Sequence, residues 1–354
     1  MPNFLINTDI KLQNIITNLK DSSVIGLDTE FIRESTYYPQ LALLQLSDNS
    51  NNYCIDILEI QDNQPIADLL RNEDIIKVIH SSKQDLEVLY HYFGCYPINL
   101  FDTQIAYNLL SPEISISYSN LVKKYCNIEL KEGSWRTDWL KRPLSDEKIE
   151  YAANDVKYLI KLYEILKNEL ILNDRLDWFM EEQIIDLKMS NIITDPELSW
   201  KKINLPSNLQ SNQLNNIKIL SKWREQKAIE NNLPKRWIFS DSELIKIVTA
   251  KTDKLDYVLK NIKYSPNTED ENFIKSIIGL KCNEEMISKK SMDPSLYNLR
   301  ASKCQKTLEE VCLKYNIAST LIANKRELDS YARGNMNVKF LSGWRFKIFG
   351  KLVQ

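Results

Sequence analysis

The chain has 354 residues, of which 43% are hydrophobic and 27% charged, with a net charge of −2, so it is long enough for two or three globular domains. No apolar run approaches the ~18 residues of a membrane helix and the N-terminus does not resemble a secretory signal, so we expect a cytoplasmic protein without membrane contact. Six scattered cysteines, no Cys-x-x-Cys pair and only two histidines argue against a zinc site and favour free thiols in a reducing compartment.

The first half of the chain mixes strand-like and helix-like patterns. Short aliphatic or β-branched runs predict strands at Val24–Glu30, Leu41–Ser47, Tyr53–Asp56, Ile75–His80 and Ile98–Asp102. Helical periodicity predicts helices at Asp9–Lys20, Pro65–Arg71, Lys83–Tyr92, Thr103–Leu110, Ser119–Cys126 and Ser145–Leu170. Tyr38-Pro39 suits a turn, so we expect the first two strands to be antiparallel neighbours. The pattern favours one mixed α/β sheet covered by helices.

The second half contains no convincing strand. Helices are predicted at Asp174–Ser190, Asn212–Asn231, Asp241–Ala250, Lys254–Asn261 and Asn267–Ile278, with a further helical group from Ser295 onward. Ser291-Met292-Asp293-Pro294 resembles a linker. We therefore expect an α/β domain over residues 1–190 and two small helical domains over 205–285 and 292–354.

Charge is distributed unevenly between the halves. Residues 1–194 carry 18 Lys and Arg against 30 Asp and Glu, a balance of −12, while residues 195–354 carry 28 against 18, a balance of +10. Such a division suggests an acidic part that holds cations and a basic part that binds a polyanion such as a nucleic acid. Lysine-rich helices are also common on ordinary surfaces, so charge alone leaves both readings open.

Two acids end the first predicted strand. Because side chains alternate across a strand, Asp28 and Glu30 share one face, ~7 Å apart along the backbone. At an effective dielectric near 20 such charges repel by roughly 2–3 kcal/mol unless a cation lies between them. The alternative is a solvated strand end with incidental acids.

Two further acids lie near predicted helix ends or faces. Asp85 follows Ser82 by three residues where a strand gives way to a helix, which suits either a capping box or a third acid at the end of the sheet. Tyr151 and Asp155 are four residues apart and share one helix face, so the phenol could orient a water beside the carboxylate. The alternative is an exposed aspartate beside a packed tyrosine.

Taken together, these four acids fit a site for two divalent cations. Hydrolysis of a phosphodiester needs a hydroxide at neutral pH and stabilisation of the negative charge that builds on the leaving oxygen. A pair of metal ions supplies both. Oxygen ligands without histidine or cysteine favour Mg²⁺ or Mn²⁺ over zinc.

The motifs resemble the DEDD exonuclease superfamily in its tyrosine subtype, and within it the ribonuclease D family. The superfamily motifs are Asp28-Thr29-Glu30-Phe31, His80 with Asp85, Phe101-Asp102-Thr103-Gln104, and Tyr151 with Asp155. The family resemblance rests on Tyr37-Tyr38-Pro39-Gln40-Leu41, Leu44-Gln45-Leu46, Ser134-Trp135-Arg136-Thr137-Asp138-Trp139-Leu140 and Arg142-Pro143-Leu144. The family segment usually begins Ser-Arg-Thr-Asp-Trp, and here one residue is inserted at its start. The resemblance implies a ribonuclease H-like fold.

The basic half resembles HRDC domains, which are helical nucleic-acid-binding modules. Residues 209–278, with Lys222-Trp223-Arg224 and Leu233-Pro234-Lys235-Arg236, carry the first resemblance. Residues 297–352, with Leu341-Ser342-Gly343-Trp344-Arg345, resemble the more degenerate second HRDC domain of the family.

The resemblance also implies roles for single residues. Asp28, Glu30 and Asp155 would hold the metal that activates water, Asp28 would bridge to the second metal, and Asp85 would support it. Tyr151 would align the nucleophile. Phe31, Gln45, His80 and Asp102 are expected near the terminal nucleotide, with structural packing as the equal alternative.

The expected function is 3′→5′ exoribonuclease activity by a monomer that releases nucleoside 5′-monophosphates from tRNA precursors and other small structured RNAs. Two alternatives remain open. One is a 3′→5′ DNA exonuclease, because the same acids occur in proofreading and helicase-associated domains. The other is a non-catalytic RNA-binding protein that binds RNA through its basic tail.

Overall fold

The computed structural model describes residues 1–131, 137–188, 193–206, 209–262, 264, 266–279 and 293–354. The motif residues Ser134-Trp135-Arg136 and the linker residues Ser291-Met292 lie outside these ranges. The chain forms two compact units, the first comprising Met1–Ile32, Gln40–Lys188 and Ser291–Gln354, and the second Arg33–Pro39 and Met189–Lys290.

A six-stranded mixed sheet lies at the centre of the first unit, in the order β1-β4-β3-β2-β5-β6. β2 pairs antiparallel with β3 and parallel with β5, so the predicted antiparallel neighbours are confirmed. The strands are β1 Asn3–Ile6, β2 Val24–Ile32, β3 Gln40–Ser47, β4 Asn52–Asp56, β5 Ile76–Ile79 and β6 Leu100–Asp102.

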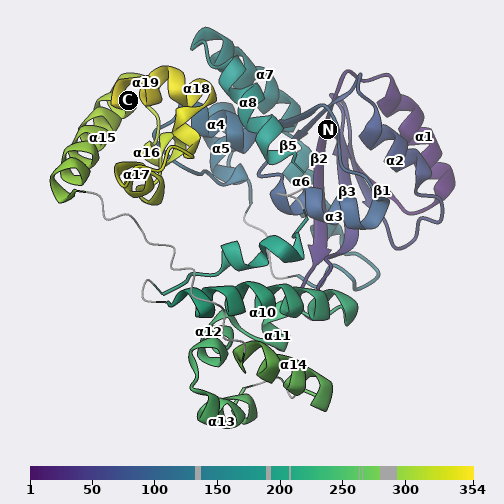
Figure 1. Ribbon diagram of the computed structural model, residues 1–354. Coiled ribbons are helices and arrows are strands. Elements are labelled where there is room, and N and C mark those ends of the chain that lie inside the picture. The colour runs from purple at the N-terminus through teal and green to yellow at the C-terminus, as the bar shows by residue number, and fades with distance from the viewer. Residues whose placement is uncertain (132–136, 189–192, 207–208, 263, 265, 280–292) are drawn as a thin grey trace. The chain divides into compact units, whose positions relative to one another are not determined.

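Helices flank this sheet, as Figure 1 shows. They are α1 Asp9–Lys20, α2 Gln64–Arg71, α3 Lys83–Phe93, α4 Thr103–Leu110, α5 Tyr118–Cys126, α6 Asp146–Val156, α7 Leu159–Leu172 and α8 Leu176–Asp186. Side chains of Thr8, Asp102, Ser117 and Ser145 accept hydrogen bonds from the first turns of α1, α4, α5 and α6, which explains where these helices begin. Gly94, at φ +67°, ends α3 in the left-handed conformation that glycine adopts without strain.

Two features of the first unit differ from the sequence prediction, one in the sheet and one in a helix. β1 was not predicted; it pairs parallel with β4. The single helix predicted over Ser145–Leu170 is wrong, because the structure has α6 and α7 with a break at Lys157 and Tyr158. The residues around the break contain neither proline nor glycine, and the apolar periodicity continues through it. The sequence therefore carries no signal for a break.

The C-terminal segment of the first unit shares a hydrophobic core with helices α4, α5, α7 and α8. Trp344 stacks on Trp178 with ring centroids 4.6 Å apart, and the Arg345 guanidinium donates to Glu182 at 2.9 Å. The elements of the segment are α15 Pro294–Tyr315, α16 Ser319–Ile322, α17 Lys325–Ala332, η3 Lys339–Leu341, α18 Gly343–Arg345, η4 Phe346–Gly350 and α19 Lys351–Val353.

In its described residues, the second unit is helical apart from the short segment Arg33–Pro39. Its elements are η1 Pro196–Lys202, α10 Ser211–Glu230, α11 Lys235–Ile238, α12 Asp241–Thr249, η2 Thr252–Lys254, α13 Leu255–Lys260 and α14 Thr268–Gly279. Tyr37 belongs to the core of this unit, and its hydroxyl donates to Glu225 at 2.6 Å. The backbone N–H groups of Tyr37 and Tyr38 both donate to the side-chain oxygen of Asn232. The connection between β2 and β3 is therefore part of the helical unit.

Among the helices that the structure describes, none combines the length and the apolar character needed to cross a bilayer. The division into three functional domains at 1–190, 205–285 and 292–354 stays a prediction.

Replacing Trp344 with alanine should destabilise the first unit by roughly 3–5 kcal/mol, because the side chain is 1% exposed and its removal leaves a cavity against Trp178. Urea unfolding followed by circular dichroism measures the change. Trp237→Ala is the matched control: this tryptophan is 47% exposed, and its loss should cost no more than about 1 kcal/mol. Equal losses in the two variants would contradict the shared core.

Candidate active site

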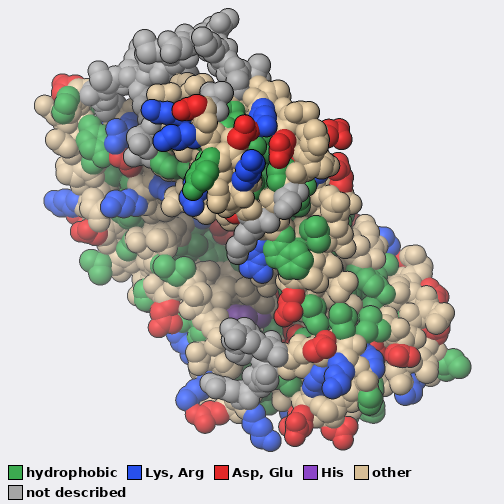
Figure 2. All heavy atoms as spheres, turned by 90° about the horizontal axis from the view of Figure 1, so that it is seen from below, with side chains coloured by type: hydrophobic (Ala, Val, Ile, Leu, Met, Phe, Trp, Pro, Cys, Tyr) green, Lys and Arg blue, Asp and Glu red, His purple; other side chains and the backbone are tan. Residues whose placement is uncertain are grey.

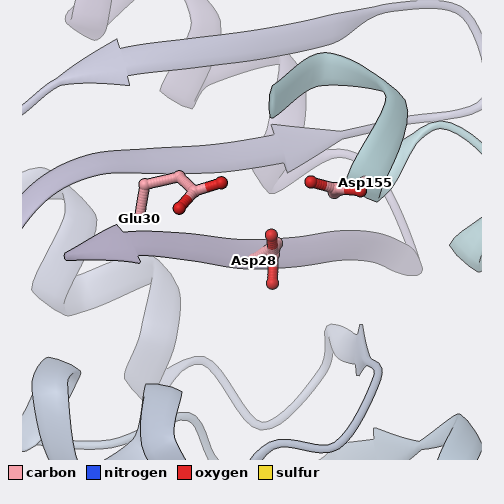
Figure 3. Close-up of side chains that lie close together, drawn as sticks. All are labelled: Asp28, Glu30 and Asp155. Carbon is pink, nitrogen blue, oxygen red and sulfur yellow. The ribbon is translucent and has the colours of Figure 1, made fainter. Parts of the chain in front are cut away.

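Three carboxylates converge beside the middle of β2. Asp28 and Glu30 project from one face of the strand, and Asp155 reaches them from α6, which packs against β2 and β3. One ligand oxygen from each lies within 4.8 Å of the others (Figure 3). A register irregularity between Glu30 and Phe31 follows the acids at once, and bulges of this kind commonly re-aim side chains beside active sites.

The electrostatics of this cluster favour a cation. Burial, followed by the charges of Asp155 and Asp85, raises the pKa of Glu30 from 4.5 to about 8. Burial also raises the pKa of Asp155 to about 7, and burial with the neighbouring acids raises that of Asp28. Within the described residues, no lysine or arginine forms an ion pair with these three acids. An oxygen-only donor set without a basic partner fits divalent metal ions.

Asp85 is a near neighbour of the cluster rather than one of its three closest members. It lies in the first turn of α3, is 7% exposed, and its carboxylate accepts a hydrogen bond from the Thr29 hydroxyl. Burial raises its pKa to about 7. Ser82 makes no side-chain cap bond, so the capping-box alternative is not formed. Asp85 is thus held to the same strand as Asp28 and Glu30.

Tyr151 lies one helical turn before Asp155 on α6, and its hydroxyl is close enough to offset part of the rise in the pKa of the Asp155 carboxyl. Burial and the surrounding acids raise the pKa of Tyr151, which keeps the phenol protonated. Its ring lies 6.1 Å from that of Trp139, measured between centroids. The phenol is therefore placed to donate a hydrogen bond beside the carboxylates.

Asp102 organises the turn that leads to Asp85. Its carboxylate accepts the backbone N–H groups of Ser81, Ser82 and Gln104 at 3.0, 2.8 and 2.8 Å. The first two bonds fix the turn between β5 and α3, and the third caps α4. With 3% exposure and these bonds, Asp102 is a structural support, while its predicted contact with a nucleotide stays a prediction.

His80 is also engaged by the protein at both ring nitrogens. Nε2 lies 3.0 Å from the carbonyl oxygen of Ile116 and Nδ1 lies 2.9 Å from the Thr103 hydroxyl. A bond to a carbonyl oxygen requires the proton on Nε2, and burial lowers the pKa of this histidine.

Gln45 pairs with Asp28 across β2 and β3, which puts both side chains on one face of the sheet. It is 0% exposed, and neither of its amide atoms has a hydrogen-bond partner among the described residues. Phe31 is half-buried beyond the bulge. The contacts of both residues with a nucleotide stay predictions.

The structure adds four residues that sequence reasoning missed. Thr29 holds Asp85, Ser47 and Tyr118 bond to the backbone just after Asp155, and Gly26 lies opposite Ser47. Of these four residues, only Gly26 could have been found from the sequence, because a glycine inside a strand often marks a close approach of another backbone segment. The hydroxyl groups lie on elements distant in sequence, and no local pattern points to them.

Comparison with known proteins agrees with this arrangement. A family model described as 3′-5′ exonuclease matches residues 3–171, and the HRDC domain model matches residues 213–268. The fold and the carboxylate cluster define a 3′–5′ exonuclease domain of the DEDD type, which implies divalent metal ions, followed by an HRDC domain.

Full-length relatives give the family. Ribonuclease D of Zymomonas mobilis is 33% identical over 98% of this chain and 92% of its own length. Ribonuclease D of Escherichia coli is 29% identical over 99% and 96%. The crystal structure of E. coli RNase D matches with a TM-score of 0.83 and 27% identity, covering 100% of this chain and 98% of that one. The chain belongs to the ribonuclease D family.

Without divalent metal, the free energy of unfolding should fall as pH rises from about 4 to about 8. The folded-state pKa values of Glu30 and Asp155 lie above their ordinary values, so the folded state binds more protons in this window and raising the pH favours unfolding. Urea unfolding in EDTA at several pH values measures the slope. Glu30→Gln should flatten it, whereas Glu34→Gln, at an exposed position, should not. Identical slopes in wild type and Glu30→Gln would contradict the assignment.

Proposed function

We propose that this chain is a 3′→5′ exoribonuclease that uses two divalent cations, Mg²⁺ or Mn²⁺, to release nucleoside 5′-monophosphates from the 3′ ends of tRNA precursors and other small structured RNAs. The observation that carries the proposal is the convergence of Asp28, Glu30 and Asp155, with Tyr151 one helical turn before Asp155 on α6. Membership of the ribonuclease D family supports RNA as the substrate, because the E. coli relative is described as an exoribonuclease involved in structured RNA processing.

The residues of the chain take distinct parts in this proposal. Asp28, Glu30 and Asp155 would hold one cation, while Asp28 and Asp85 would hold the second. When bound, the cations would lower the pKa of a water molecule and stabilise the charge that builds on the phosphate. The Tyr151 hydroxyl would donate a hydrogen bond that orients the attacking water. Thr29 would keep Asp85 in place by its hydrogen bond to the Asp85 carboxylate. Asp102 would do so by fixing the turn that precedes α3.

The basic C-terminal segment supports a polyanionic substrate. Residues 293–354 carry 11 Lys and Arg against 5 Asp and Glu. A hollow of about 480 Å³ in this segment is lined by residues that include Arg326, Lys339, Glu327 and Val338. On the face drawn in Figure 2, basic side chains are interspersed with acidic ones.

A degradation assay with matched RNA and DNA tests the proposal. An oligonucleotide labelled at its 5′ end is incubated in Mg²⁺, Mn²⁺ or chelator. The expected result is a ladder that shortens from the 3′ end, only for RNA and only with metal, because an RNA enzyme can sense the 2′-hydroxyl. Equal digestion of DNA would favour a DNA exonuclease. RNA binding without hydrolysis in any metal would favour a non-catalytic binding protein.

Asp155→Asn should reduce turnover at least 1,000-fold while the dissociation constant for RNA changes less than threefold, because it removes a metal-binding charge and no basic group. Tyr151→Phe should reduce turnover roughly 100-fold, in the range for one positioned hydrogen-bond donor. The 5′-labelled ladder gives the rate, and filter binding in EDTA gives the affinity. Tyr92→Phe, which alters a 40% exposed phenol on α3, is the control. Wild-type turnover in Asp155→Asn would refute the site.

A further inference from the structure

The helix that carries Asp155 is interrupted immediately after it. α6 ends at Val156 and α7 begins at Leu159, although the sequence between them contains no proline or glycine. An interruption leaves backbone carbonyl and N–H groups without the partners that a continuous helix would supply. When such groups are buried they need other partners, or the break is costly. The Tyr158 carbonyl oxygen keeps a local partner, since it accepts the N–H of Leu162 at 2.9 Å, but two other groups at the break bond outside this segment.

Two hydroxyl groups from elsewhere in the first unit are their partners. The Ser47 hydroxyl, on β3, donates to the carbonyl oxygen of Val156 at 2.9 Å, and Ser47 is 1% exposed. The Tyr118 hydroxyl, at the start of α5, accepts the backbone N–H of Tyr158 at 3.1 Å. One bond thus holds the last residue of α6, and the other holds the residue before α7.

Strand β2 packs closely against the end of α6 at Gly26. Gly26 pairs with Ser47 across β2 and β3 and lies two residues before Asp28 on the same strand face. A Cβ atom at Gly26 would lie 2.3 Å from the Ser47 hydroxyl oxygen and 3.0 Å from the Val156 carbonyl oxygen. The end of α6 and the strand of Asp28 are therefore in close contact two residues before Asp28 and one residue after Asp155.

Tyr118 is itself supported from the active-site side. His80 bonds through Nε2 to the carbonyl of Ile116, two residues before Tyr118, and the two rings lie 5.9 Å apart. The Tyr118 hydroxyl is thus placed by the segment that His80 anchors.

We propose that Ser47 and Tyr118 are positioning residues for the Asp155 carboxylate, acting through the backbone of the α6–α7 junction. The inference rests on the proposed function, because Asp155 is taken as a metal ligand. Loss of either hydroxyl group frees the junction and spreads the Asp155 carboxylate over several positions relative to Asp28. Supporting groups that orient a metal ligand typically contribute 10–100-fold to metal affinity.

Binding of Mn²⁺ alone to the full chain tests this inference without RNA, with the free-ion signal measured by electron paramagnetic resonance. Ser47→Ala and Tyr118→Phe should each weaken Mn²⁺ binding 10–100-fold. Asp155→Asn should weaken it as well, and adding Ser47→Ala to that variant should produce no further loss. With RNA, both hydroxyl variants should need correspondingly more metal for half-maximal rate and recover at high Mn²⁺, with KM for RNA within twofold of wild type.

Matched controls separate positioning from a general loss of stability. Ser199→Ala removes a 1% exposed serine whose hydroxyl donates to the Pro196 carbonyl at 2.8 Å, in the second unit. Tyr331→Phe removes a hydroxyl that donates to the Val353 carbonyl at 2.9 Å, in the C-terminal segment. Both controls should bind Mn²⁺ like wild type while lowering the melting temperature about as much as the test variants.

The inference is overturned if Ser47→Ala and Tyr118→Phe both bind Mn²⁺ within twofold of wild type. It is also overturned if the controls lose Mn²⁺ affinity to the same extent. Failure of the proposed function gives a different result, since the wild-type protein itself would then show no metal-dependent hydrolysis of RNA. If one test variant does not fold, the other decides the outcome, because the two hydroxyl groups hold different backbone atoms.

Discussion

Repulsion between half-buried carboxylates is the constraint on which the rest of this structure depends. Asp28, Glu30 and Asp155 approach within 4.8 Å without an ion-pair partner in the described part of the chain. At that separation each pair of charges repels by roughly 3 kcal/mol at an effective dielectric near 20. A fold that keeps them together without metal must hold their backbone segments firmly, and the protonation that burial favours relieves part of the repulsion. The same repulsion makes the cluster a strong attractor for divalent cations.

Several elements of the first unit hold the carboxylate residues in place. β2 lies inside the sheet between β3 and β5, so its acids have little freedom to separate. Asp102 fixes the turn before Asp85 with two backbone bonds, and Thr29 holds the carboxylate itself. Much of the site's geometry thus depends on ordinary hydrogen bonds to backbone groups, made by residues that are not themselves proposed to bind metal.

The sequence predicted the acids, Tyr151 and five of the six strands, because each depends on alternation or spacing within a few residues. It could not predict the break after Val156, since apolar periodicity continues through Lys157 and Tyr158 and the side chains that bond to the break lie on β3 and α5. β1 was missed because four edge residues beside a helix give little signal. The packing of Tyr37 with α10 depends on contacts 188 residues apart, which no local pattern encodes.

The path of the chain affects how the protein can be dissected. Arg33–Pro39 belongs to the helical unit, whereas Ser291–Gln354 shares a core with the exonuclease helices. A shortened version that stops after Lys188 would therefore expose the apolar surface around Trp178 to solvent. It would also leave Tyr37 without the residues that it contacts in the second unit. Such a fragment would be expected to aggregate, and its inactivity would say nothing about the chemistry. Point substitutions are the cleaner way to separate catalysis from RNA binding in this chain.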